Sequence, residues 1–132
     1  MTAEGFAAGA EALLGAPFRL GGRTPATGLD CVGLVACALG GAEAPTGYGL
    51  RNSAIDRHLA FATRAGFISA TGPIARGDLV LAVPGPAQHH LLVALGPAIF
   101  IHAHAGLGRV VPLSGPLPWP TRARWRLAHE ST

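Results

Sequence analysis

The apolar positions at the start of the chain recur at helical spacing. Residues 3–14 predict an amphipathic helix, and the glycine and proline that follow favour its end. Its inward face is formed by Phe6, Ala10, Leu13 and Leu14. Residues 15–28 are typical of a turn-rich loop. Asp30 is a good N-cap residue, so we expect a second helix of small residues over 31–39.

A third helix is expected before the pattern changes. Asn52 or Ser53 is placed to cap it, and it runs to about Arg64 before Gly66 ends it. Its inward positions are Ile55, Leu59 and Ala62 or Thr63.

After residue 76 the apolar positions alternate, which predicts strands. The expected strands cover residues 77–84, 89–96, 98–105, 108–113 and 122–128. A tight turn at Gly96 and Pro97 predicts a hairpin between the second and the third. In the last strand arginines alternate with Trp125 and Leu127, which favours an exposed edge strand. Helices followed by an antiparallel meander indicate an α+β fold, and we expect one domain over residues 1–132.

Composition argues against several classes of protein. About half of the 132 residues are apolar and 13% are charged, so the chain can bury a core. All ten basic residues are arginines and the net charge is +3, but the arginines are scattered, which argues against a nucleic-acid partner. No apolar run approaches the roughly 20 residues of a membrane span. The first basic residue is Arg19 and two glutamates precede it, so we expect synthesis in the cytoplasm without a signal peptide.

Two cysteines and several histidines are the candidate reactive groups. Cys31 and Cys37 are six positions apart, and six helical residues turn the chain by about 600°, so no disulfide between them is expected. We interpret Cys37 as core filling. His58 and His89 are expected at the surface.

The hairpin decides which histidines can meet. Paired residues in an antiparallel hairpin share a constant sum of residue numbers, and a turn at 96–97 gives about 192 to 194. An even sum places His90 on one face with His102 and His104. An odd sum pairs His89 with His104 and separates His90 from both. The turn residues leave both sums open.

Cys31 has the position of a nucleophile at the start of a helix. A helix N-terminus and a neighbouring imidazole lower the pKa of a thiol, and a third polar group fixes the imidazole ring. Cys31, His90 and His102 meet these needs if the sum is even, and the helix N–H groups then face a developing oxyanion. The alternative is a buried structural cysteine. A zinc site of His90, His102 and His104 is less favoured, because no carboxylate lies near them in the sequence.

Four segments carry a resemblance to a known family. GAPFRLGGRTPATGLDCVGLV, RGDLVLAV, HLLVALG and IFIHAHAG follow one another over roughly residues 10–113. In this order they resemble the motifs of the NlpC-type cell-wall peptidases, a papain-like family of cysteine peptidases. The family's two histidines stand as far apart as His90 and His102. Its usual tyrosine is Phe18 here, and the serine after its cysteine is Val32.

The resemblance implies a papain-like fold, in which the helix with the cysteine packs on the sheet with the histidines. It implies Cys31 as the nucleophile, His90 as general base and acid, and His102 as the residue that orients the His90 ring. His104 is the rival for the third role. The resemblance favours the even sum. We expect no metal and no cofactor.

The loop before Cys31 offers candidate substrate-binding residues. We interpret Arg23 as a partner for a substrate carboxylate, although a solvated loop arginine is the plain alternative. Asp30 is first a helix cap, with a second role near the oxyanion.

The resemblance implies hydrolysis of peptidoglycan stem peptides, typically at the γ-D-glutamyl to diaminopimelate bond. The GGRTPATGLDCVGLV segment is similar to the peptidases of phage tails and gene transfer agents. We therefore expect tail-tip or baseplate proteins as partners, and action in the periplasm of a target cell. Two other functions stay open: a structural tail adaptor that keeps the peptidase fold, and an amidase or acyltransferase.

Overall fold

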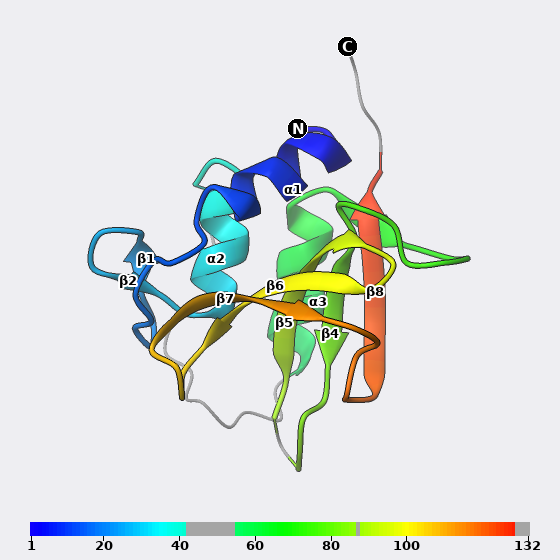
Figure 1. Ribbon diagram of the computed structural model, residues 1–132. Coiled ribbons are helices and arrows are strands. Elements are labelled where there is room, and N and C mark those ends of the chain that lie inside the picture. Colours follow the sequence, from blue (N-terminus) through cyan, green and yellow to red (C-terminus); the bar gives the residue numbers. More distant parts are fainter. Residues whose placement is uncertain (42–54, 87, 129–132) are drawn as a thin grey trace.

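The structure is a computed structural model that describes residues 1–41, 55–86 and 88–128 (Figure 1). Within these residues, three helices cover one face of a six-stranded antiparallel sheet. The predicted α+β fold is therefore confirmed. Among the described helices, none combines the length and the hydrophobicity that a membrane crossing requires.

The first helix, α1 (Ala3–Glu11), begins where the hydroxyl of Thr2 accepts a backbone hydrogen bond at 2.8 Å. Phe6 and Ala10 are fully buried, as predicted. Leu14, which was expected on the same inward face, is exposed, because the helix ends before it and the chain continues in turns.

The second helix, α2 (Cys31–Ala38), is buried on most of its surface. The Asp30 carboxylate accepts a hydrogen bond from the Gly33 N–H at 2.8 Å, which confirms the predicted N-cap. A side chain at Gly33 would collide with the carbonyl of Gly22. The loop before Cys31 therefore lies directly against the first turn of α2, and its short strands β1 (Arg23–Thr24) and β2 (Gly28–Leu29) pair with each other.

The third helix, α3 (Ile55–Arg64), ends as predicted at Gly66, which has a left-handed φ of 97°. The candidate caps Asn52 and Ser53 lie outside the described residues. The sequence pattern missed the short strand β3 (Phe67–Ser69), which directly follows the turn at Gly66.

The sheet has the strand order β3-β8-β4-β5-β6-β7. Its other strands are β4 (Leu79–Ala82), β5 (His90–Gly96), β6 (Ile99–His104), β7 (Arg109–Ser114) and β8 (Thr121–Leu127). All five expected strands are present. The prediction of an exposed edge position for the last one is wrong, because β8 pairs with β3 on one side and β4 on the other.

A buried carboxylate explains why the arginines of β8 lie inside the sheet. Asp78 is fully buried just before β4, and it accepts hydrogen bonds from Arg124 Nη1 at 2.7 Å and Arg126 Nε at 2.6 Å. Burial raises the pKa of Asp78, but hydrogen bonds from Arg126, the Ala75 N–H and Arg124 outweigh it, so the pKa lies below its ordinary value. The alternating arginines are therefore partners of an internal charge.

The register of the β5–β6 hairpin shows whether the sum of paired residue numbers is even or odd, which the sequence left open. Val93 pairs with Ile101 and Ala94 with Phe100, so both pairs have the even sum of 194, with an irregularity only at the turn. His90 and His102 therefore project from the same face of the sheet.

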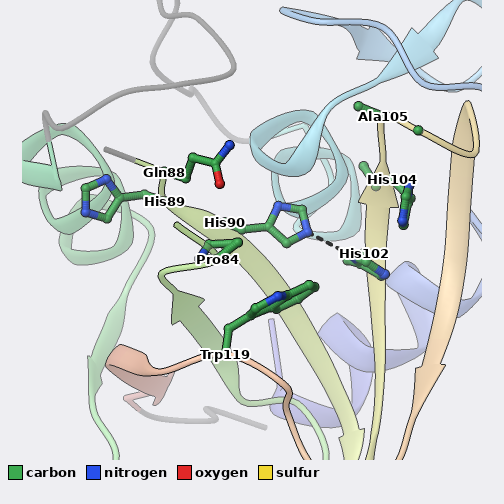
Figure 2. Close-up of a pocket in the computed structure, with 10 residues that line it drawn as sticks. Pro84, Gln88, His89, His90, His102, His104, Ala105 and Trp119 are labelled. Atoms are coloured by element: carbon green, nitrogen blue, oxygen red, sulfur yellow. Dashed lines mark hydrogen bonds between the residues drawn. The ribbon is translucent and has the colours of Figure 1, made fainter. Parts of the chain in front are cut away.

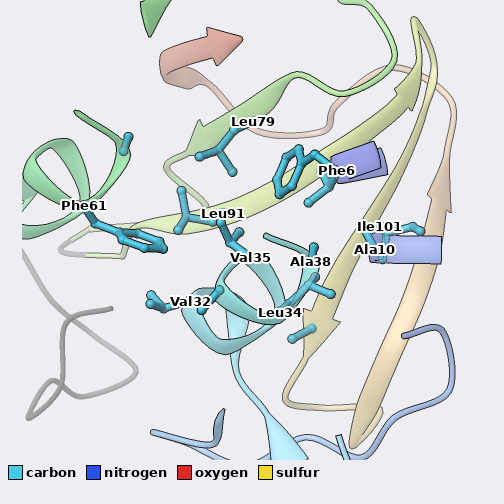
Figure 3. Close-up of a cluster of buried hydrophobic side chains, with 14 of the residues drawn as sticks. Phe6, Ala10, Val32, Leu34, Val35, Ala38, Phe61, Leu79, Leu91 and Ile101 are labelled. Carbon is cyan, nitrogen blue, oxygen red and sulfur yellow. The ribbon is translucent and has the colours of Figure 1, made fainter. Parts of the chain in front are cut away.

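Two clusters of apolar side chains lie on the two faces of the sheet. The larger one joins the helices to the sheet and includes Phe6, Val35, Phe61, Leu91 and Ile101 (Figure 3). The smaller one lies on the opposite face. Its buried members are Val80, Ala82, Leu92, Ala94 and Phe100, and Ile74, Leu113, Leu117 and Trp119 pack against them.

Candidate active site

Asp30 fixes the start of the helix that carries Cys31. One carboxylate oxygen caps α2, and the other accepts a hydrogen bond from the Gly21 N–H at 2.8 Å. Arg23 Nη1 lies 3.1 Å from the same carboxylate and donates to the Gly22 carbonyl at 2.8 Å. Asp30 therefore ties the preceding loop to the first turn of α2, and Cys31 is held at a defined place.

The Cys31 thiol lies against the backbone of β5. Burial raises its pKa to about 12, although hydrogen bonds from the backbone at Leu91 and Val32 act in the opposite direction. The expectation of a lowered thiol pKa is therefore wrong for this arrangement, because desolvation outweighs the helix N-terminus. Leu91 directly follows His90 in β5, so the thiol lies one residue along the strand from that histidine.

His90 and His102 form a hydrogen-bonded pair. His90 Nε2 and His102 Nδ1 are 2.8 Å apart, and the ring centroids are 5.0 Å apart (Figure 2). His104 lies farther along the same face, with its ring 5.4 Å from that of His102, and its Nδ1 accepts the Leu107 N–H at 3.0 Å. His102, and not His104, is thus the bonded partner of His90.

The direction of this hydrogen bond decides whether His90 can act as a base. If His90 donates its Nε2–H to His102, its Nδ1 keeps a free lone pair and can accept a proton. The reverse direction leaves a proton on Nδ1 and removes that capacity. In Figure 2, the second ring nitrogen of His90 points away from His102.

Both imidazoles are neutral at neutral pH. Burial, together with the neighbouring His102 and His104, lowers the pKa of His90 to about 3. Burial and His104 lower the pKa of His102 to about 4. Together with the protonated Cys31 thiol, this gives an uncharged resting site.

Cys31 and the histidine pair approach the site from opposite faces of the sheet. Cys31 packs with the cluster on the helix side, whereas His90 pairs with Ala82 of the cluster on the other side. Both residues begin their elements, so they are placed at the ends of α2 and β5. Among the hydrogen bonds of the described residues, none joins the Cys31 thiol to the His90 ring. Proton transfer between them stays a prediction.

A pocket of about 300 Å³ opens beside the histidine pair (Figure 2). Its described lining consists of Pro84, Gln88, His89, His90, His102, Ala103, His104, Ala105, Gly106 and Trp119. The Trp119 ring centroid lies 5.9 Å from that of His90 and 6.1 Å from that of His102. The local sequence around Trp119 does not indicate this position, because only the place of β8 beside β4 brings the indole to the histidines.

The NlpC/P60 family pattern matches residues 15–116. The chain belongs to the NlpC/P60 family. Solved structures with similar folds include NlpC2 from Trichomonas vaginalis, with 20% identity and a TM-score of 0.70 over 97% of this chain and 47% of that one. The P60 domain of an antigen from M. avium subspecies paratuberculosis has 23% identity and a TM-score of 0.65, covering 97% of this chain and 96% of that one. The peptidoglycan hydrolase RipB from Mycobacterium tuberculosis has 23% identity and a TM-score of 0.66, covering 97% and 65%.

These similarities support the fold of this NlpC/P60 chain. The chain spans about half the length of NlpC2. No curated protein matches the chain.

Other predicted positions in this NlpC/P60 chain differ from their expectations. His58 was expected at the surface but is buried, with 3% of its surface exposed, and burial lowers its pKa. His89 is half-buried, and its ring centroid lies 6.3 Å from that of His58. Cys37 is half-buried, and its thiol donates to the Arg23 carbonyl at 3.1 Å. It therefore also anchors the loop before α2.

Within the described part of the chain, no cluster of three histidine, cysteine or carboxylate side chains has an arrangement that could hold a metal ion. The three histidines of the hairpin thus lack the geometry that the zinc alternative needs. Arg23 and Asp30 hold each other and the loop, so a role in substrate binding stays a proposal for both.

Proposed function

We propose that this NlpC/P60 chain is a cysteine endopeptidase that hydrolyses peptidoglycan stem peptides. One observation carries the proposal: the His90–His102 hydrogen bond lies one residue along β5 from the backbone that holds the Cys31 thiol. Members of the NlpC/P60 family are cysteine peptidases and amidases that act on peptidoglycan. The roles follow from the chemistry of the three side chains.

The first half of the reaction starts from the neutral thiol. His90 Nδ1 accepts the Cys31 proton as the sulfur attacks the amide carbonyl carbon, and the carbonyl π-electrons move to the oxygen. The positive end of the α2 dipole stabilises that oxyanion. The oxyanion then collapses, the C–N bond breaks, and the His90 imidazolium gives its proton to the leaving amine. The product is a thioester on Cys31.

Water completes the cycle. His90 takes a proton from the water as its oxygen attacks the thioester, and the second tetrahedral intermediate releases the Cys31 sulfur. The proton on His90 returns to that sulfur, so the protein ends in its starting state. His102 holds the His90 ring throughout, because its Nδ1 accepts the Nε2–H.

The finer substrate assignment is the γ-D-glutamyl to diaminopimelate bond. The likeness of the cysteine and histidine segments to the cell-wall peptidases supports it. The described residues that line the pocket include no acidic side chain, which suits a peptide rich in carboxylates. Arg23 is the proposed partner for one of these carboxylates, with Asp30 near the oxyanion.

The proposal is tested by digesting purified muropeptides with the chain and weighing the products by mass spectrometry. Cleavage within the stem peptide, lost in both Cys31→Ala and His90→Ala, is the expected result. Cys37→Ser, which keeps a donor for the Arg23 carbonyl, is the matched control and keeps the activity. Full activity in a folded Cys31→Ala variant would refute the role of Cys31, and products cut between sugar and peptide would assign an amidase instead.

Carriage on a phage-like tail is a separate proposal. It rests on the likeness of the GGRTPATGLDCVGLV segment to tail and gene transfer agent peptidases. The chain then joins tail-tip or baseplate proteins and acts in the periplasm of the target cell. Mass spectrometry of purified particles tests this, and particles that contain the other tail proteins but lack this chain contradict it.

A further inference from the structure

Trp119 lies over the histidine pair in a way that nothing in its local sequence indicates. Its ring centroid is within about 6 Å of both imidazole centroids, at 5.9 Å from His90 and 6.1 Å from His102. The His90 ring stands almost perpendicular to the indole, at an interplanar angle of 87°. It also forms one wall of the pocket, opposite His104 in the view of Figure 2.

The fold fixes Trp119 in this place from two directions. The Val83 N–H donates to the Pro120 carbonyl at 2.9 Å, and Ala82 pairs with both His90 of β5 and Thr121 of β8. The segment before β8 is thereby held beside the first residue of β5. The indole also packs against the apolar cluster on this face of the sheet, and so does Leu117 two residues earlier.

An indole in this position has two physical effects on the imidazoles. It removes water from one side of the His90–His102 hydrogen bond, which strengthens that bond and restricts rotation of the rings. It also offers an aromatic ring to the imidazolium that forms on His90 during catalysis, at the distance where such a ring attracts a cation.

We propose that Trp119 is a positioning residue that shields the His90–His102 hydrogen bond from water and keeps His90 in the tautomer with a free Nδ1. The part that concerns turnover rests on the proposed peptidase function. The shielding itself does not, and it can be measured without substrate.

The first experiment follows the imidazole nitrogens by ¹⁵N NMR over a pH titration. In the wild-type chain, His90 has a protonated Nε2 and an unprotonated Nδ1. In Trp119→Ala, water reaches the rings, so the titration midpoints of His90 and His102 shift to higher pH and the two tautomers become mixed. The other titratable or charged groups around the pair are His89 in the same pocket, His104 on β6, Arg109 opposite it on β7, and the Cys31 thiol against the Leu91 backbone. None of them is changed.

Two control variants separate shielding from general packing. Leu117→Ala removes apolar contact with the same cluster but leaves the indole in place, so the midpoints stay at their wild-type values. Trp119→Phe keeps an aromatic ring over the pair and restores most of the wild-type titration. Circular dichroism shows whether each variant is folded. Unchanged midpoints in a folded Trp119→Ala chain, or an equal shift in Leu117→Ala, would overturn the proposal.

The second experiment measures turnover of a muropeptide across pH. Trp119→Ala lowers kcat by about 100-fold with little change in KM, because a misplaced base costs the chemical step more than binding. The acid limb of kcat/KM shifts to higher pH in the same variant. A rise in KM alone, with an unchanged pH profile, would make Trp119 a substrate platform and overturn the proposal. A chain that hydrolyses no muropeptide at all contradicts the proposed function, and the NMR result still decides the shielding.

Discussion

Replacement of Asp78 by asparagine tests the internal charge network that joins the start of β4 to β8. The Asp78 side chain is 0% exposed and accepts hydrogen bonds from Arg124 Nη1 at 2.7 Å, Arg126 Nε at 2.6 Å and Arg126 Nη2 at 3.0 Å. It also accepts the Ala75 N–H at 3.0 Å. Asparagine keeps the shape but turns an amide N–H₂ toward guanidinium donors and leaves both arginines without their anion.

Removal of one partner from a buried ion pair costs about 3–5 kcal/mol. The Arg126 side chain is 38% exposed and keeps contact with water, so the lower end applies, and we expect a loss of about 3 kcal/mol in the free energy of unfolding. For a chain of 132 residues this lowers the melting temperature by about 10 °C.

The pH dependence gives the second readout for Asp78. Its pKa in the folded chain lies below the ordinary value of 3.8, so its contribution is present above that value and is lost as the pH falls through the folded pKa. The stability difference between wild type and Asp78→Asn is therefore full at neutral pH and narrows in acid. Urea unfolding at several pH values measures it, with Glu4→Gln in the exposed Arg76 ion pair as the control. Equal stability of Asp78→Asn and wild type at pH 7 would refute the account.

Three further predictions concern the site and the helix that carries the thiol. Iodoacetamide labels Cys31 slowly at pH 7, because a pKa of about 12 leaves about one thiolate in 10⁵ molecules, and the labelling rate rises about tenfold per pH unit. Mass spectrometry measures the rate, and fast labelling that no longer rises above neutral pH contradicts the neutral resting site. His102→Ala lowers kcat by about 100-fold, because His90 loses the acceptor for its Nε2–H. The loss of kcat is smaller in His102→Asn, which restores an acceptor, and in His104→Ala; equal losses in steady-state assays of the three variants would contradict the role of His102. Gly33→Ala destabilises the chain by about 1–3 kcal/mol, because the new methyl group meets the carbonyl of the loop before Cys31; an unchanged thermal melt argues against this packing.

Local signals in the sequence determined the elements and the faces of the site. Asp30 caps α2 because a short side-chain acceptor before a helix satisfies its free N–H groups wherever the helix lies. Strand alternation limited the partners of His90 to two cases, and the motif resemblance favoured the one that the register confirms. The pairing of His90 with His102 was therefore within reach of sequence reasoning.

Only the tertiary structure decided what surrounds those side chains. The arginines of β8 suggested an edge strand, yet a carboxylate 46 positions from Arg124 draws them inside the sheet. That placement brings Trp119 over the histidines. Separately, the packing of α2 against β5 buries the Cys31 thiol, which reverses the expected shift of its pKa. Periodicity and capping act over a few residues along the chain, so the sequence displays them. Strand order and desolvation depend on which distant segments pack together, and no local pattern carries that information.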